Sequence, residues 1–308
     1  MVRTEAARGV LLVFVDGVGI GTRDARRNPL FHSPPPFLRE LLGGALPSLR
    51  QRRIETDDAV CLPLDARLGV AGLPQSGTGQ STLYSGVNTA RLIGRHFGPY
   101  LYSTTKPVLV EHSIFARMNT LGLRATLANA FPQRFFDYLD GPRKRMVAGM
   151  YAALTAGLRF RTINDLKRGE AVSTDITAER WPAIGHPDAP LSTAYEAGRT
   201  LARIASRYAF TMFEYFATDK AGHERSMELA TRALLDVDAL LRGVHDGVRH
   251  DRTLVLLTSD HGNMEELSVK THTRNPVPLI LFGARDGFDA GSLRNLSHLV
   301  PAICKFLS

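Results

Sequence analysis

Cysteine is scarce in this sequence, with only Cys61 and Cys304 among 308 residues. The two residues lie far apart along the chain and in no metal-binding spacing, which argues against a cysteine metal site and against a disulfide framework. We therefore expect a protein of the reducing cytoplasm.

Long apolar runs are also absent. No stretch approaches the roughly 20 apolar residues that a membrane-spanning helix needs, so we expect no membrane partner. Val10–Val15 follows two arginines, as the apolar core of a signal peptide would. It ends in Asp16 after only six residues, however, which is too short for that role. We interpret this run as a buried strand.

Positive charge is in excess, and the formal net charge is +8. Such a charge would suit nucleic acid, a membrane surface or small phosphorylated substrates. The arginines are dispersed along the chain and are not interleaved with aromatic residues, which argues against nucleic acid. A small phosphorylated substrate is the partner that we expect, and the sequence does not indicate an oligomeric state.

Apolar patterns predict an α/β fold. Val10–Val15, Leu254–Thr258 and Pro278–Phe282 are continuous apolar runs, as expected for strands buried on both faces. Residues 191–208, 226–248 and 299–307 have helical spacing, and 113–121 followed by 124–129 adds a helix and a strand. This alternation predicts a mainly parallel central sheet with helices on both faces.

The middle of the chain differs in composition from its ends. Residues 132–190 are rich in Arg, Gly and Pro and show weaker strand signals. We predict that they form a small inserted cap, and that 1–131 and 191–308 together form the core.

Two predicted strands end in residues that can bind metal. Asp16 follows the first strand and precedes a Gly-rich loop whose spacing does not fit G-x-G-x-x-G, which excludes a dinucleotide loop. Asp260 and His261 follow the run Leu254–Thr258. Ligands collect at the carboxyl ends of strands in open α/β sheets. Taken alone, each of these residues is also compatible with an ordinary turn.

Three more residues have suitable chemistry. Asp219 and His223 are four residues apart, so a helix starting there would place them on one face. His272 lies in a loop just before the strand Pro278–Phe282. A surface pair and a lone loop histidine are the plainer interpretations of these positions.

A Gly-rich segment around Ser76 precedes a predicted helix over 81–86. A serine at a helix N-terminus sits in positive potential among free backbone N–H groups, which suits a phosphate group. Locally an N-cap serine explains the pattern equally well. The combined set is what decides the interpretation, because it supplies three carboxylates, three imidazoles and a hydroxyl, about what two divalent ions require.

In this order the motifs resemble the alkaline phosphatase superfamily, nearest the branch of cofactor-independent phosphoglycerate mutase and phosphopentomutase. The motifs are Asp-Gly after the first strand, Ser76 in its Gly-rich turn, Asp-x-x-Gly-His, Asp-His-Gly-Asn and His-Thr-x-Asn-Pro-Val-Pro. They cover the first 90 and the last 110 or so residues. Gln80 stands where the family's nucleophile loop has a histidine, and the sulfatase pattern Cys/Ser-x-Pro-x-Arg is not matched.

The resemblance implies the roles of these residues. Asp219, His223 and His272 would hold one metal ion, and Asp16, Asp260 and His261 the other, with Ser76 as nucleophile touching the metals. The cofactors would be two divalent ions, Mn or Zn. Candidates for substrate contacts are Thr78, Arg91, Arg95 and Lys220.

Three functions are compatible with these observations. A phosphomonoesterase or phosphodiesterase comes first, because a cap of at most about 60 residues is poorly suited to keeping water from a phosphoserine. A phosphomutase or other phosphotransferase is the second. The third is a basic scaffold that binds polyanions without catalysis, which the complete set of competent ligands disfavours.

Overall fold

The computed structural model describes residues 8–141 and 145–308. Its strands are β1 (Gly9–Val15), β2 (Ile54–Glu55), β3 (Ala59–Leu64), β4 (Ala125–Leu127), β5 (Asn129–Ala130), β6 (Val172–Ser173), β7 (Phe210–Tyr215), β8 (Thr253–Thr258) and β9 (Val277–Gly283).

The helices before residue 145 are α1 (Pro29–His32), α2 (Pro36–Leu41), α3 (Ser76–Ser85), α4 (Thr89–Ile93), α5 (Thr105–His112), α6 (Ile114–Thr120) and α7 (Gln133–Asp140). Those after it are α8 (Ala148–Thr155), α9 (Ile163–Lys167), α10 (Ala194–Ala205), α11 (Ala217–Glu224), α12 (Met227–Gly247) and α13 (Leu299–Leu307). Within the described ranges, none of these helices is long and apolar enough to cross a membrane.

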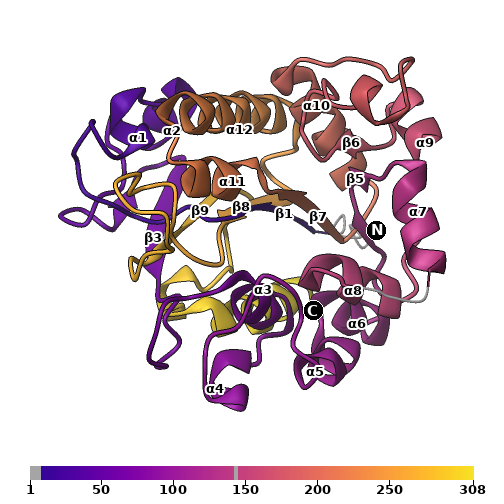
Figure 1. The fold of residues 1–308 in the computed structure, drawn as a ribbon, viewed down its shortest axis with the longest axis horizontal. Helices are drawn as coiled ribbons and strands as arrows, with labels where there is room; N and C mark the ends of the chain where they lie inside the picture. Colours follow the sequence, from indigo (N-terminus) through magenta and orange to yellow (C-terminus); the bar gives the residue numbers. More distant parts are fainter. Residues whose placement is uncertain (1–7, 142–144) are drawn as a thin grey trace, which may run out of the picture.

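A seven-stranded sheet in the order β2-β3-β9-β8-β1-β7-β4 forms the middle layer (Figure 1). The neighbours β8, β1, β7 and β4 run parallel, whereas β9 is antiparallel to β8 and β3 is antiparallel to β9. The predicted α/β fold with helices on both faces is therefore confirmed, and an antiparallel edge is added to its parallel half.

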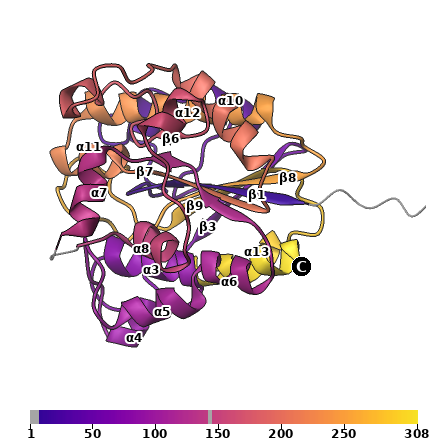
Figure 2. The same ribbon diagram turned by 90° about the vertical axis from the view of Figure 1, so that its right-hand side faces the viewer.

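The central strands are buried on both sides, as their continuous apolar sequences predict. In β1, Leu12 and Phe14 point into one core, while Leu11 and Val13 point into the other. The first core lies under α3, α6, α8 and α13, and the second lies under α10 and α12 (Figures 1 and 2). Because successive side chains point to opposite faces, only a strand that is apolar throughout can serve both cores.

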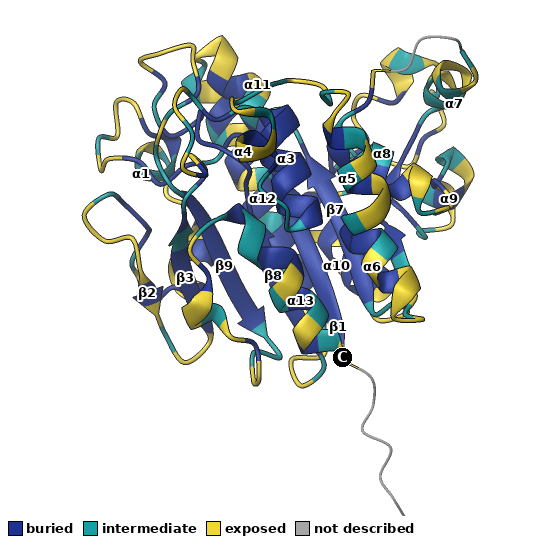
Figure 3. Cartoon of the chain, turned by 90° about the horizontal axis from the view of Figure 1, so that it is seen from below, coloured by how far each residue is buried: buried dark blue, intermediate teal, exposed yellow. Residues whose placement is uncertain are grey.

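Helix α3 begins at Ser76, five residues before the predicted start of this helix, and every residue in it is buried. Figure 3 shows it enclosed, whereas α6 and α13 expose part of their surfaces. Two of its hydroxyls are satisfied inside the helix, since Ser81 donates to the carbonyl of Gly77 and Ser85 to that of Ser81. Its composition of Ser, Thr and Gly hides this buried helix from an analysis of apolar periodicity.

The predicted insertion contains α7, α8, α9 and β6. Helix α8 packs against α3 and α5 and contributes Ala152 and Ala153 to the first core. Helices α7 and α9 lie beyond the β7 side of the sheet (Figure 1). Residues 132–190 thus contribute both to the core and to the periphery, and their limits as a separate cap stay a prediction.

Candidate metal centre

The carboxyl ends of β1 and β8 bring Asp16, Asp260 and His261 together. Asp16 directly follows β1, and the turn after β8 carries the other two residues. The Nε2 atom of His261 lies 3.3 Å from Asp16 Oδ1 and 3.6 Å from Asp260 Oδ2. All three residues are buried. Residues 244 positions apart in sequence meet here because their strands are neighbours in the sheet.

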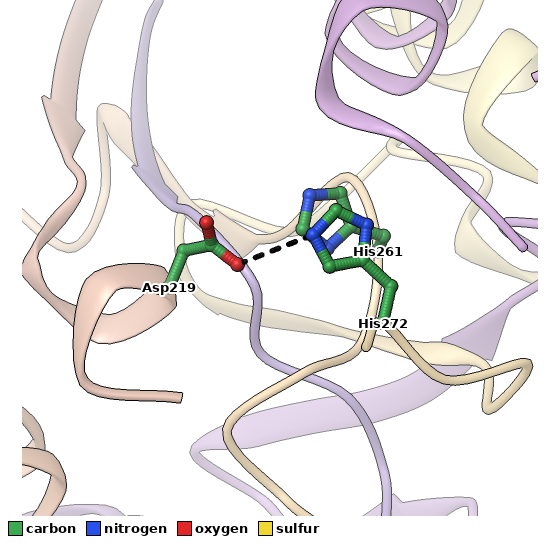
Figure 4. A group of neighbouring side chains, drawn as sticks. All are labelled: Asp219, His261 and His272. Carbon is green, nitrogen blue, oxygen red and sulfur yellow. Dashed lines mark ion pairs between the residues drawn. The ribbon is translucent and has the colours of Figure 1, made fainter. Parts of the chain in front are cut away.

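A second group forms around α11, which follows β7. On this helix, His223 Nε2 lies 3.3 Å from Asp219 Oδ2, as the four-residue spacing predicts. His272, from the loop before β9, places its Nε2 3.2 Å from that of His223 and 3.7 Å from Asp219 Oδ1. Figure 4 shows His272 stacked beside His261, with the carboxylate of Asp219 facing both rings. The two groups therefore adjoin, and the centroids of the stacked His261 and His272 rings are 3.7 Å apart.

Two of these histidines are oriented by backbone carbonyls. His272 Nδ1 lies 2.7 Å from the carbonyl oxygen of Pro74, and His223 Nδ1 lies 2.9 Å from that of Lys270. A carbonyl oxygen can only accept, so each Nδ1 carries the proton and each Nε2 presents a lone pair. Metal-binding histidines are held in the same way, with the remote nitrogen donating to a fixed acceptor.

Ser76 is the first residue of α3 and lies beside the first group. Its hydroxyl oxygen is 2.9 Å from His261 Nε2. The close packing here requires glycine at two positions after Ser76, because a Cβ on Gly77 would meet the carbonyl of Phe97 and one on Gly79 would come within 2.9 Å of the Asp260 carbonyl. The helix N-terminus can therefore enter the site only with this Gly-rich sequence.

Burial makes the metal-free site electrostatically unfavourable. It raises the pKa of Asp260 to about 7 and, together with the nearby charges of Asp260 and Asp219, raises the pKa of Asp16 well above its usual range. Burial also lowers the pKa of His261 to about 3, with His272 adding to the effect. The carboxylates repel one another, and the histidine cannot compensate by taking a proton.

The residues present fit divalent metal ions. Among the described residues, the buried oxygens Asp16 Oδ1 and Asp260 Oδ2 have no hydrogen-bond partner. Two groups have ligand atoms within 4.8 Å of one another, Asp16, Asp260 and His261, and Asp219, His261 and His272. His261 thus adjoins both groups, while His223 completes the second from the exposed side of α11. Carboxylate oxygen and neutral imidazole nitrogen suit Zn and Mn alike.

Two supporting residues escaped the sequence analysis. Asn263 donates from Nδ2 to Asp219 Oδ1 at 2.7 Å and so orients that carboxylate. Glu265 is buried and accepts hydrogen bonds from the Gly19 and Asn263 amides, the Thr273 hydroxyl and the Asn275 side chain. It ties the loops after β1 and β8 to the loop that carries His272. In the sequence, Asn263 appeared only as the last residue of the Asp-His-Gly-Asn motif, with no role assigned, and Glu265 only as part of a polar run after a strand.

A third missed residue is Glu214 in β7, which is buried and accepts a hydrogen bond from the Tyr84 hydroxyl at 2.8 Å. Burial raises the pKa of Glu214 to about 7. Its position in an apolar strand gave no reason to single it out.

The residues predicted to contact substrate are dispersed in the structure. Thr78 is buried, and its hydroxyl donates to the Gln75 carbonyl at 3.2 Å, inside the loop. Lys220 is exposed and lies 3.6 Å from Glu224 on the same helix. Arg91 is exposed on α4, and Arg95 stacks on Tyr102. Gln80, at the family's histidine position, places Nε2 3.5 Å from Asp16 Oδ2.

The part of the chain from α10 to α13 carries five of the seven candidate metal residues, and it is this part that matches a known family. Residues 189–308 match the Metalloenzyme superfamily. The resemblance predicted from the sequence is thereby confirmed for this region.

Curated relatives match this chain over about as many residues as the family does. The 2,3-bisphosphoglycerate-independent phosphoglycerate mutase of Thermomicrobium roseum is 32% identical over 115 residues, which are 34% of this chain and 22% of that enzyme. The enzyme of the same name from Anaplasma marginale is 34% identical over 98 residues, 28% of this chain and 20% of the relative. The similarity thus spans only about a fifth of each relative.

Solved structures are similar over the whole chain in fold. The PH0037 protein from Pyrococcus horikoshii superposes with a TM-score of 0.58 at 15% identity, covering 99% of this chain and 98% of that one. The alkaline phosphatase of the Antarctic bacterium TAB5 gives 0.53 at 11% identity, with 99% and 100% covered. The fold is therefore alkaline phosphatase-like.

Proposed function

We propose that this chain is a two-metal phosphate-ester hydrolase that acts through a phosphoserine at Ser76. The observation that carries the proposal is the contact of the Ser76 hydroxyl with His261 at the N-terminus of α3, beside two adjoining groups of ligands. A nucleophile, a positive helix end and a metal-binding set meet at one point. Phosphoryl transfer through a metal-assisted phosphoserine can use all three.

The ligands divide into the group at the ends of β1 and β8 and the group around α11. Asp16, Asp260 and His261 would hold one ion, with Ser76 beside them, and Asp219, His223 and His272 would hold the other. Bound Mn or Zn ions would lower the pKa of the Ser76 hydroxyl and neutralise charge on the phosphoryl oxygens. Asn263, Pro74 and Lys270 would keep the ligands oriented through their hydrogen bonds.

The chain's own residues account for the covalent step. The Oγ atom of Ser76 would attack phosphorus in line with the ester oxygen, forming an Oγ–P bond as the alcohol of the substrate leaves. At the start of α3 the N–H group of Thr78 donates to the Phe97 carbonyl, so the N–H groups of Ser76 and Gly77 would be the ones to donate to phosphate oxygens. Water would then cleave the Oγ–P bond, which releases inorganic phosphate and restores Ser76.

The small size of the predicted cap favours hydrolysis over transfer. A mutase must hold its dephosphorylated intermediate and exclude water until the phosphoserine has reacted. Of residues 132–190, α8 is already used in the core beneath the sheet, so even fewer residues remain to cover the site.

Phosphomutase activity is the second candidate, and a specific observation favours it. Both curated relatives described above are named 2,3-bisphosphoglycerate-independent phosphoglycerate mutases. Their names describe enzymes of which this chain matches only about a fifth, so that activity is a proposal for this chain as well.

An isotope experiment separates these two functions. A sugar phosphate labelled in its phosphoryl group is incubated with the protein and Mn or Zn, and the peptide containing Ser76 is examined by mass spectrometry after acid quenching. We expect free labelled phosphate and a phosphoryl group on Ser76. Label moved within the sugar, with negligible free phosphate, would establish the mutase instead.

A further inference from the structure

A cavity of about 730 Å³ lies at the end of the sheet away from the metal centre. It opens between the ends of α6, α8 and α10, where β4 and β7 begin. Tyr208 in its wall precedes β7, whereas Asp219 follows that strand. The six residues of β7 separate the two sites by about 20 Å of strand.

The wall of this cavity is basic. Four arginines line it, Arg124, Arg159, Arg161 and Arg207, against the two acids Asp165 and Glu170. Asp165 is buried and already paired, since Arg159 and Arg168 both lie 2.6 Å from its Oδ1. Arg207 lies 3.9 Å from Glu170, so the surplus of positive charge in the wall is carried by Arg124 and Arg161.

Arg161 is the decisive residue because it is a buried cation without a carboxylate partner. Its side chain is 8% exposed. It donates to three neutral oxygens, the carbonyls of Leu127 and Glu170 and the hydroxyl of Thr126. Among the described residues, no acid lies within ion-pair distance of it. A buried charge bonded only to neutral groups is costly, and an anion in the cavity would offset that cost.

Arg124 extends this positive region toward solvent. It is exposed, and in the described part of the chain it has neither a hydrogen bond from its guanidinium nor an ion pair, but it lies 4.8 Å from the ring centre of Tyr208. Arg161 lies 5.9 Å from the same ring. Partial burial acts to raise the pKa of Tyr208, yet the guanidinium groups of Arg161 and Arg124 bring that pKa below its usual value. The lowered pKa of the Tyr208 phenol is consistent with the positive charge of these two arginines beside it.

We propose that this cavity binds a small phosphate-bearing molecule, at a site separate from the metal centre. Guanidinium groups match phosphate oxygens in geometry, and a phosphate offers enough charge to balance the surplus. The volume is in the range of cavities that hold small-molecule ligands. The cavity contains neither the metal ligands nor Ser76, so the molecule is bound there and not turned over.

Calorimetric titration with pyrophosphate tests this site in the full chain. The variant Arg124→Gln/Arg207→Gln removes two charges from the cavity, and Arg249→Gln/Arg252→Gln removes two from the same end of the sheet outside it. Pyrophosphate that binds at the metal centre contributes equally to both titrations. We expect an additional binding event in the wild type that weakens about tenfold or more in the cavity variant and less than about twofold in the control.

Hydrogen exchange locates the event, with protection expected at residues 158–161 and 207–209 when pyrophosphate is added. Equal weakening in both variants, or no binding beyond that of the metal centre, would overturn the proposal. The result is independent of whether the metal centre hydrolyses esters.

Discussion

The imidazole of His272 lies 2.7 Å from the carbonyl oxygen of Pro74, two residues before Ser76. One hydrogen bond thus joins the second ligand group to the loop that delivers the nucleophile. It fixes Nε2 of His272 toward Asp219 and His223, and it holds the start of α3 against the site. Placement of the metal ligands and of the nucleophile is therefore coupled in this fold.

Replacing Ser76 by alanine should lower turnover of a phosphate ester by about 10³-fold or more, because it removes the hydroxyl that contacts His261 Nε2 and that we propose as nucleophile. Most of the metal should remain, since carboxylates and imidazoles dominate the affinity. Steady-state kinetics and metal content by mass spectrometry check both points. Ser81→Ala, in the same helix, is the matched control and should retain activity. Full activity of Ser76→Ala would move the nucleophile elsewhere.

Removing the amide of Asn263 should weaken metal binding. Asn263→Leu leaves Asp219 without its hydrogen bond at 2.7 Å, and loss of such a partner typically costs 10–100-fold, so we expect an increase of about that size in the metal dissociation constant. Competition with a chelating dye measures it. An unchanged dissociation constant would show that Asp219 does not need this support.

Glu265→Gln should lower the free energy of unfolding by about 2 kcal/mol, because a buried carboxylate that accepts four hydrogen bonds becomes an amide with one acceptor oxygen. Chemical denaturation of the metal-free protein measures the loss directly. Glu266→Gln, at the next and more exposed position, is the control and should change stability little. A loss as small as that of the control would contradict the role of Glu265 in joining the three loops.

Without metal, the stability of the folded protein should fall as the pH rises, because of the carboxyl of Asp260. The pKa of Asp260 is raised to about 7 by burial, so in the folded metal-free protein this carboxyl favours the protonated form. The stabilisation of the folded state by this carboxyl is greatest below the pKa of Asp260 in the unfolded chain, about 4. This stabilisation is lost as the pH rises through 7. With EDTA, the melting temperature should fall between pH 5 and pH 8, and added Mn or Zn should remove that fall. Asp260→Asn should flatten the EDTA curve, and an unchanged curve would contradict this origin.

The sequence predicts the parts of the site that local patterns encode. Apolar runs located β1, β8 and β9, and residues directly after such strands, Asp16 and Asp260, meet at one edge because parallel neighbours end together. The spacing of Asp219 and His223 predicted their shared helix face. All of these follow from rules that act within a few residues.

Other parts depend on contacts that no local pattern carries. Glu265 acts through partners as far away as Gly19, and Asn263 through Asp219, so neither position stands out from an ordinary turn. The hydroxyl of Thr78 donates to the Gln75 carbonyl, and its predicted contact with substrate stays a prediction. The arginines around Tyr208 come from three separate segments and were visible in the sequence only as dispersed charge.

Anomalous diffraction from crystals loaded with Mn or Zn tests the two-metal centre most directly. We predict two peaks roughly 3.5–4 Å apart. One should be bounded by Asp16, Asp260 and His261 with Ser76 beside it, and the other by Asp219, His223 and His272. A single peak, or a site from which His272 lies more than about 8 Å away when ligand bonds are near 2 Å, would contradict it.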